Sequence, residues 1–241
     1  MHHHGPWGTG GGGGDSVSSS ERAACDQPAR GRTRSGRDIR TLIVGDVHGC
    51  ADELEHLVHL AQPSRIVLVG DLFTKGPKPL ETWRCIERLE AEAVLGNHDA
   101  AMLARPTRYR SMALPPAAWA WLERLPLTRQ VGEWTVVHAG LDPTRGRAGT
   151  RRATALVVRR WPNDTSDAHP FWFEIWPGPE RVVYGHDAIR GLQDHRPRTL
   201  GLDTGCVYGG RLTGYLVEAD RVLSVPAARV YCAVDGPRVE R

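Results

Sequence analysis

Short apolar runs alternate along this chain with polar motifs that contain glycine. The runs cover residues 41–44, 66–69, 93–95, 134–137 and 182–184. Their length and their β-branched content predict buried strands. Leucines at positions 54, 57 and 60 predict an amphipathic helix over residues 51–60, and residues 79–89 repeat the same spacing. This order of strands and helices predicts βαβαβ organisation and an α/β fold.

Two tryptophan-containing segments interrupt the alternation. Residues 104–127 carry Pro115-Pro116 followed by Trp119 and Trp121, which predicts a loop, a short helix and another loop. Residues 145–179 hold three more tryptophans, Trp161, Trp172 and Trp176. We expect most of these rings to pack in the core or in a lid, with the stacking of one ring on a base or an aromatic substrate group as the alternative.

The last part of the chain has a hairpin pattern. Residues 211–217 and 221–227 flank Glu218-Ala219-Asp220 as the strands of a hairpin flank their turn. We therefore expect the chain to turn antiparallel after His186.

A polar motif follows each predicted strand. The motifs are Gly45-Asp46-Val47-His48-Gly49, Gly70-Asp71, Gly96-Asn97-His98-Asp99, His138-Ala139-Gly140 and Gly185-His186. Ligands collect at the carboxyl ends of strands in open α/β sheets, and glycines beside them let the backbone turn sharply. Mixed carboxylate, amide and imidazole donors suit a pair of divalent ions. The pattern therefore predicts a metal centre built from Asp46, His48, Asp71, Asn97, His138 and His186.

The composition sets the limits of the domain and of its location. Residues 1–38 are rich in Gly, Ser and Arg, and we expect them to be a disordered tail before one domain over residues 39–241. The net charge of +3 is too mild to indicate a nucleic-acid partner. Five widely spaced cysteines, no long apolar run and no signal-peptide pattern predict a cytoplasmic protein without a membrane partner.

The order of the motifs resembles that of the calcineurin-like metallophosphoesterases, over about residues 40–225. Within that superfamily the chain is most similar to the branch of phosphoprotein phosphatases and symmetrical diadenosine tetraphosphatases. Residues 202–213, LDTGCVYGGRLT, resemble the signature of the bacterial members. The resemblance implies a four-layer αββα sandwich with mixed sheets and the hydrolysis of a phosphate ester or phosphoanhydride.

The resemblance also implies a role for each ligand. Asp46 and His48 would bind the first metal ion, and Asp71 would bridge both ions. The second ion would be completed by the other three ligands, Asn97, His138 and His186. Two cations lower the pKa of a water between them, so a bridging hydroxide would attack phosphorus in line with the leaving oxygen. Manganese is the expected metal, with iron or zinc as alternatives.

Two neighbours of Asn97 are the candidate acid–base residues. His98 resembles the family's proton donor to the leaving group, and an imidazole suits that task because its ordinary pKa is near 6.5. Asp99 is the nearest candidate to orient His98. Alternatively, Asp99 caps the following helix.

The chain departs from the family pattern in one loop. Where phosphoprotein phosphatases continue GDxVDRG, this chain has Thr74 in place of an Asp and Lys75 in place of the phosphate-binding Arg. Lysine can still hold phosphate as a point charge. We therefore expect Lys75 to contact phosphate, with a solvated loop charge as the alternative. Tyr208 and Arg211 are further candidate groove residues, although Arg211 could instead be an edge-strand charge.

Three functions remain open at this stage. The first is a phosphomonoesterase acting on small phosphates or phosphoprotein. The second is a symmetrical dinucleoside polyphosphate hydrolase, in which bases and phosphates would meet Trp119, Trp121, Arg105, Arg108 and Arg110. The third is a phospholigand-binding module without turnover, for which Thr74 and Lys75 are the only sign. Phosphorylated small molecules, nucleotides or phosphoproteins are the expected ligands.

Overall fold

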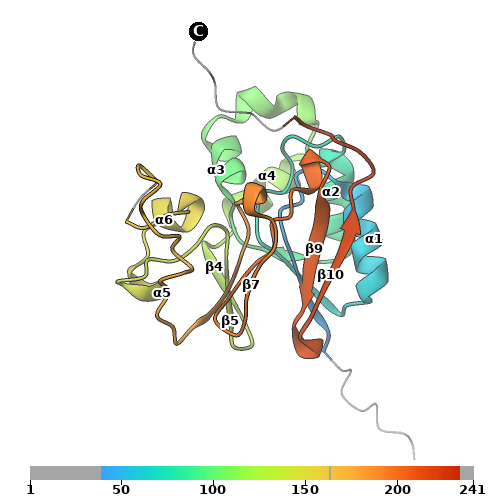
Figure 1. Cartoon of the computed structure of the whole chain (residues 1–241). Coiled ribbons are helices and arrows are strands. Elements are labelled where there is room, and N and C mark those ends of the chain that lie inside the picture. Colours follow the sequence, from blue (N-terminus) through green and yellow to red (C-terminus); the bar gives the residue numbers. More distant parts are fainter. Residues whose placement is uncertain (1–38, 163, 234–241) are drawn as a thin grey trace, which may run out of the picture. The chain divides into compact units, whose positions relative to one another are not determined.

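The computed structural model describes residues 39–162 and 164–233, and within them ten strands form two sheets (Figure 1). The predicted tail, residues 1–38, lies outside the described residues. The domain boundary at residue 39 therefore stays a prediction.

The first sheet has the strand order β10-β9-β1-β2-β3. Its bounds are Thr41–Val44 for β1, Arg65–Leu68 for β2, Glu92–Ala93 for β3, Arg211–Leu216 for β9 and Arg221–Pro226 for β10. β1, β2 and β3 are parallel, whereas β9 runs antiparallel to both β1 and β10. The sheet is therefore mixed, and the predicted β9–β10 hairpin is confirmed.

The second sheet has the order β4-β5-β6-β8-β7. Its bounds are Thr128–Val131 for β4, Trp134–Val137 for β5, Arg181–Tyr184 for β6, Gln193–His195 for β7 and Thr199–Gly201 for β8. β5, β6 and β8 are parallel, and β4 and β7 are antiparallel neighbours at the two edges. The expectation that the chain turns antiparallel after His186 is wrong for β8, because β8 runs parallel to β6.

The helices cover the outer faces of the two sheets. They are α1 (Ala51–Ala61), α2 (Pro79–Arg88), α3 (Asn97–Ala104), α4 (Pro116–Glu123), α5 (Gly146–Gly149) and α6 (Arg152–Val157). Short 3-10 turns η1 (Pro106–Met112), η2 (Ala188–Arg190), η3 (Cys206–Tyr208) and η4 (Val217–Ala219) connect other elements. Figure 1 shows α1 and α2 beside β9 and β10, with α5 and α6 beyond β4 and β5 on the other side.

Three buried clusters hold these layers together. Between the sheets, Ile43 and Val67 share a core with Val136 and Val183. A second cluster joins the first sheet to α1, α2 and α4, and a third joins β5 and β6 to α6 and to the buried ring of Trp172. The predicted four-layer α/β arrangement is therefore confirmed.

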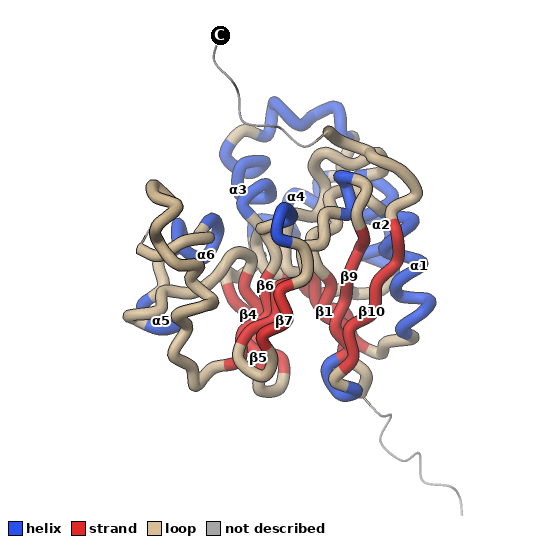
Figure 2. Tube along the Cα trace, in the orientation of Figure 1, coloured by secondary structure: helices blue, strands red, loops and turns tan. Residues whose placement is uncertain are grey.

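The fold brings the ends of several strands to one region. β1, β5 and β6 are each followed directly by a predicted motif, the motif after β2 begins one residue later, and three residues separate β3 from the start of α3 at Asn97. In Figure 2 the loops that follow these strands gather above the two sheets. The polar motifs therefore meet where the sheets lie side by side.

Candidate metal centre

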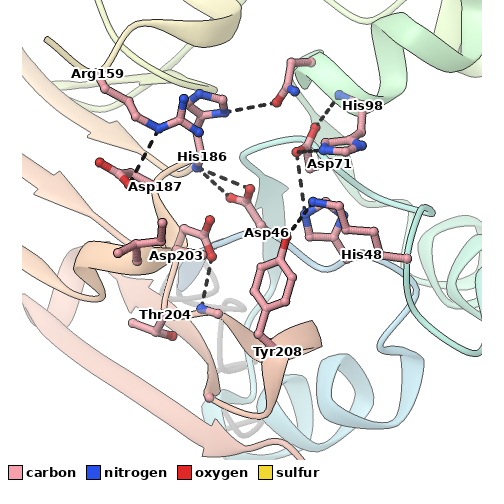
Figure 3. Close-up of a pocket in the computed structure, with 16 residues that line it drawn as sticks. Asp46, His48, Asp71, His98, Arg159, His186, Asp187, Asp203, Thr204 and Tyr208 are labelled. Carbon is pink, nitrogen blue, oxygen red and sulfur yellow. Dashed lines mark hydrogen bonds and ion pairs between the residues drawn. The ribbon is translucent and has the colours of Figure 1, made fainter. Parts of the chain in front are cut away.

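The strand-end loops enclose a pocket of about 330 Å³ (Figure 3). Five of the six predicted metal ligands line it, namely Asp46, His48, Asp71, Asn97 and His186. The sixth, His138, is fully buried and contacts this group from behind. Residues from five separate loops thus converge on one space.

Asp71 lies at the middle of the cluster. Its Oδ2 is 3.6 Å from His48 Nε2, and its Oδ1 is 3.5 Å from His138 Nε2. It belongs to two sets of donors, one with His48 and His98 and the other with Asp46 and His138, and within each set the ligand atoms lie within 4.8 Å of one another. This position fits a carboxylate shared by two cations.

His138 and Asn97 present acceptor atoms to each other, and His186 lies beside them. His138 Nδ1 lies 2.9 Å from the carbonyl oxygen of Val69, so that nitrogen carries the proton and Nε2 keeps its lone pair. Asn97 Oδ1 lies 2.8 Å from His138 Nε2 and 3.0 Å from His186 Nδ1. With the amide in this orientation, the lone pair of His138 Nε2 faces Asn97 Oδ1, which has no proton to donate. A cation between these atoms would satisfy them all.

The ligand-bearing loops are strained. His48, Asp71 and His186 adopt φ angles of +47°, +54° and +74°, in the left-handed region that residues with a Cβ avoid. Such strain persists where the surrounding structure fixes it and is typical of functional sites. The three side chains are therefore held in place at some energetic cost.

Two glycines are required by close approach to the carboxylates. A Cβ on Gly96 would overlap Asp71 Oδ1, and a Cβ on Gly185 would overlap Asp46 Oδ1. The next amide along, that of His186, donates to both oxygens of Asp46 at 3.1 and 3.2 Å. These glycines let the backbone pack directly against the carboxylates and fix their orientation.

The electrostatics of the site favour positive ions. Burial raises the pKa of Asp71 to about 7, and burial followed by repulsion from Asp203 and Asp71 raises the pKa of Asp46 well above its usual range. Burial also lowers the pKa of His186 to about 2 and that of His48 well below its ordinary value. Buried carboxylates beside neutral imidazoles have too little positive charge around them. The donor set therefore fits divalent metal ions.

His98 lines the same pocket. Its side chain is 29% exposed and its Nε2 lies 4.0 Å from Asp71 Oδ2. Burial, followed by repulsion from Lys75 and His138, lowers the pKa of His98 to about 4. Among the imidazoles that line the pocket, His98 is the one not predicted to bind metal, so it is free to face a bound molecule.

Asp99 takes the capping arrangement rather than contacting His98. Its Oδ2 accepts the backbone N–H groups of Asp71 at 2.8 Å and Gly96 at 3.0 Å, and its Oδ1 accepts that of Leu72 at 3.0 Å. Its carboxylate is fully buried at the start of α3. Asp99 therefore positions the Asp71 loop, and we do not assign it the role of orienting His98.

Two of the three predicted substrate residues line the pocket. Lys75 and Tyr208 both do so, and Lys75 Nζ donates to Tyr208 Oη at 2.6 Å. Arg211 lies outside the pocket lining, because its guanidinium is held by the hydroxyl and the carbonyl of Ser224 on β10. We therefore leave Arg211 out of the site.

Thr74 contacts a candidate ligand. Its hydroxyl lies 3.1 Å from His48 Nδ1, and the other ring nitrogen, Nε2, lies 3.6 Å from Asp71 Oδ2. The residue that departs from the family pattern thus faces the metal centre.

The residues around Trp119 and Trp121 lie outside the pocket lining. Both rings pack against the core between the first sheet and its helices, and Trp121 meets Trp83 edge to face at 5.6 Å. Three exposed arginines, Arg105, Arg108 and Arg110, also lie outside the pocket lining. This segment therefore offers no base or phosphate contact within the pocket. Trp172 and Trp176 are buried, as expected for core residues.

Three charged pocket residues were missed by the sequence analysis. Arg159 and Asp187 both line the pocket and make an ion pair, with Nε and Oδ1 3.6 Å apart. Asp203 also lines it, and its buried carboxylate contacts Asp46. Arg159 follows α6, far from every motif, so no sequence signal marked it. Asp203 lies inside the stretch 202–213 that carries the family resemblance, and that was the available signal.

Comparison with known proteins agrees with this geometry. A family model described as calcineurin-like phosphoesterase matches residues 39–222. The chain belongs to this family. It is therefore a hydrolase of phosphate esters or anhydrides, and the family implies divalent metal ions.

Individual relatives narrow the comparison. The chain is 28% identical to the symmetrical bis(5'-nucleosyl)-tetraphosphatase of Vibrio parahaemolyticus, over 73% of this chain and 94% of that protein. It is 30% identical to the asymmetrical bis(5'-nucleosyl)-tetraphosphatase of a Geobacillus species, over 78% and 95%. A crystal structure of a candidate diadenosine tetraphosphatase superposes with a TM-score of 0.73 and 34% identity, covering 83% of this chain and 96% of that one. None of the helices in residues 39–162 and 164–233 has the length and apolar character needed to cross a bilayer.

Proposed function

We propose that this protein hydrolyses dinucleoside tetraphosphates at the metal centre. The observation that carries the proposal is the convergence on Asp71 of two sets of donors, beside a pocket that also holds Lys75 and Arg159. Polyphosphate is a chain of negative charges, and the positively charged side chains of Lys75 and Arg159 line the pocket that would receive it.

We assign two divalent ions to this centre, with manganese as the expected metal. Asp46 and His48 would hold one ion, and Asp71 would contact both. The other would be held by the three remaining ligands, Asn97, His138 and His186. Bound divalent ions supply Lewis-acid polarisation of phosphoryl oxygens and a nucleophile at neutral pH.

His98 is the proposed proton donor once a negatively charged substrate is bound, because that charge would raise an imidazole pKa that is otherwise about 4. His98 lines the pocket beside Asp71, and its exposed edge can reach a leaving oxygen that extends into the pocket. Delivering that proton would avoid expelling the nucleoside diphosphate with its leaving oxygen fully charged. Asp99 supports this step indirectly, because it holds the loop of Asp71 in place.

Lys75 and Arg159 are the proposed phosphate contacts. Lys75 is placed by its hydrogen bond to Tyr208, and Arg159 by its ion pair with Asp187. Both side chains are near enough to the centre to affect its charges. The positive charges of Lys75 and Arg159 partly oppose the rise that burial causes in the pKa of Asp71. Binding of phosphate to them would orient the chain for attack.

The relatives' names favour one substrate class. The Vibrio and Geobacillus relatives are named for bis(5'-nucleosyl) tetraphosphates, which favours that class over phosphomonoesters. The pocket of about 330 Å³ suits part of the phosphate chain, so the nucleosides would lie at its rim, where Ile189 is 85% exposed. The names include both symmetrical and asymmetrical enzymes, and we propose symmetrical cleavage to two nucleoside diphosphates. We also propose the cytoplasm as the location, since the four described cysteines are free.

Product analysis tests the proposal. Manganese-loaded protein is incubated separately with diadenosine tetraphosphate, p-nitrophenyl phosphate and a phosphopeptide, and the nucleotides are separated by chromatography. We expect turnover of the tetraphosphate to ADP alone. ATP and AMP in equal amounts would replace symmetrical with asymmetrical cleavage. Turnover of the two monoesters without the tetraphosphate would contradict the proposed substrate.

A matched pair of arginines tests the phosphate contact. Arg159→Met should raise the KM for the tetraphosphate at least about tenfold, as expected for loss of a charged hydrogen bond. Arg211→Met is the control, because Arg211 lies outside the pocket lining. Equal KM values in the two variants would exclude Arg159 from substrate binding.

A further inference from the structure

A second cluster of metal-binding side chains lies behind the pocket. It consists of Cys50, Glu53 and Cys206, which we call the thiol cluster. Their ligand atoms lie within 4.8 Å of one another, and the three residues are 1%, 4% and 2% exposed. None of the three lines the pocket of the proposed catalytic centre.

The cluster joins the start of α1 to η3. Cys50 precedes α1, Glu53 lies in its first turn, and Cys206 begins η3. The Sγ atoms of Cys50 and Cys206 lie within 4.8 Å of each other. A hydrogen bond between the thiols, followed by burial, raises the pKa of the Cys206 thiol well above its usual range, so a metal ion would have to displace its proton. Two sulfurs and a carboxylate thus meet in a site shielded from solvent.

The C-terminal segment holds the carboxylate of Glu53 in position. The hydroxyl of Tyr231 donates to Glu53 Oε1 at 2.7 Å, and the backbone N–H of Ala228 donates to the same oxygen at 3.0 Å. The segment is itself tied to η3, because the amides of Tyr231 and Cys232 donate to the carbonyl of Val207. Both of these donors act on Oε1, so they orient the carboxylate without using Oε2.

We propose that the thiol cluster is a third metal site, specific for a single soft divalent cation such as Zn²⁺. Paired thiolates select soft metals, and a carboxylate is an accepted companion ligand in zinc sites. The proposed catalytic centre offers oxygen and nitrogen donors only, so the two sites differ in ligand softness. Binding displaces the thiol protons to solvent and forms two metal–sulfur bonds, with no change of oxidation state.

The position of the site indicates what the bound ion does. Cys50 follows His48 and Gly49, and Cys206 begins the η3 turn that ends at Tyr208. A metal ion held by both cysteines therefore cross-links the His48 loop to the turn that carries Tyr208. We assign it a structural role that is independent of the proposed substrate.

Sulfur ligation gives a specific test. Full-length protein is first saturated with Mn²⁺ and is then titrated with Cd²⁺, a soft probe whose thiolate complexes absorb in the ultraviolet. We expect absorption that saturates at one Cd²⁺ per chain and is reversed by added Zn²⁺. Wild-type protein without this absorption would overturn the proposal.

Variants locate the site. Cys50→Ser and Cys206→Ser should each abolish the one-equivalent absorption, whereas Cys85→Ser, which removes another buried cysteine, should leave it unchanged. Glu53→Gln should retain the absorption but weaken Cd²⁺ binding at least about tenfold, which keeps the test valid if a cysteine variant fails to fold. Absorption that survives in both Cys50→Ser and Cys206→Ser would place the metal elsewhere and overturn the proposal.

Discussion

The carboxylate of Asp99 accepts the backbone N–H of Asp71 at 2.8 Å, although the two residues are 28 positions apart in the chain. The same carboxylate accepts the amides of Gly96 and Leu72, so one buried side chain fixes the start of α3 and the loop of Asp71 together. Repulsion from Asp71, after burial, contributes to raising the pKa of Asp99 to about 6. The central ligand is therefore positioned by a residue behind it.

Asp99→Asn should weaken metal binding and stability together. The amide nitrogen of Asn cannot accept the N–H groups that one carboxylate oxygen now accepts, and an unsatisfied buried donor costs about 1–3 kcal/mol. Urea unfolding of the metal-free protein measures the stability, and Mn²⁺ titration measures the affinity. Asp142→Ala is the destabilised control, since Asp142 caps a turn away from the pocket lining. Unchanged Mn²⁺ affinity in Asp99→Asn would contradict this positioning role.

His98 and Asp71 should respond differently to substitution. His98→Asn should retain both metal ions and lose about 10²- to 10⁴-fold in kcat, the usual contribution of a general acid. Asp71→Asn should lose metal and activity together, because its carboxylate lies within 4 Å of imidazole nitrogens from both donor sets. Metal content by elemental analysis and kcat by product release separate the two outcomes. A His98 variant as active as wild type would remove His98 from the mechanism.

The glycines that pack on the carboxylates should be sensitive to a single methyl group. Gly96→Ala and Gly185→Ala should each lower Mn²⁺ affinity, because the new Cβ overlaps Asp71 or Asp46. Gly132→Ala is the control, since nothing lies within 4 Å of its Cβ position and its φ of +55° causes backbone strain alone. The control should lose some stability in thermal unfolding and keep its Mn²⁺ affinity. Equal affinities in all three variants would show that close approach at the carboxylates is unimportant.

Asp142 should make stability depend on pH at the acid end. Burial alone would raise its pKa, but hydrogen bonds from Thr144 and Arg145 outweigh burial, and the pKa of Asp142 lies below its ordinary value. The ionised carboxylate therefore stabilises the folded state above the unfolded pKa of about 3.9, and this contribution is lost as the pH falls through the lower folded pKa. The stability difference between wild type and Asp142→Ala should be largest at neutral pH and shrink in acid. Urea unfolding of both proteins across this pH range measures the stability difference. A difference that grows in acid would contradict a lowered pKa of Asp142.

Much of the site was predictable because its residues follow the most apolar strands. β1 and β5 have the bounds that the apolar runs predict, since every residue in them is buried and the pattern is uninterrupted. Their motifs then fall at the strand ends by simple continuation of the chain. This is why six candidate ligands from distant motifs could be named together.

The elements that the sequence analysis missed have weak apolar patterns. β4 is an edge strand with the sequence TRQV that fully buries Val131 alone, and β7 is an edge strand with the sequence QDH that fully buries no residue. β8 has three residues and is recognisable only from its pairing with β6 and β7. Short strands of this kind depend on their neighbours rather than on their own side chains.

The pocket residues also differ in how far the sequence could predict their positions. Asp99 could orient His98 or cap α3, and only the positions of three backbone amides decided between the two. Arg159 lines the pocket although it lies in a segment without a motif. Arg211 lies outside the pocket lining because its guanidinium binds Ser224. Long cationic side chains have many rotamers, so packing rather than sequence decides which site they reach.

Anomalous diffraction from Mn²⁺-soaked crystals tests the central claim most directly. The account predicts two manganese peaks about 3.5–4 Å apart, the separation typical of two-metal sites, with Asp71 contacting both. One peak should be bound by Asp46 and His48, and the other by Asn97, His138 and His186. A single peak, or manganese bound without Asp71, would contradict a two-metal centre at these residues.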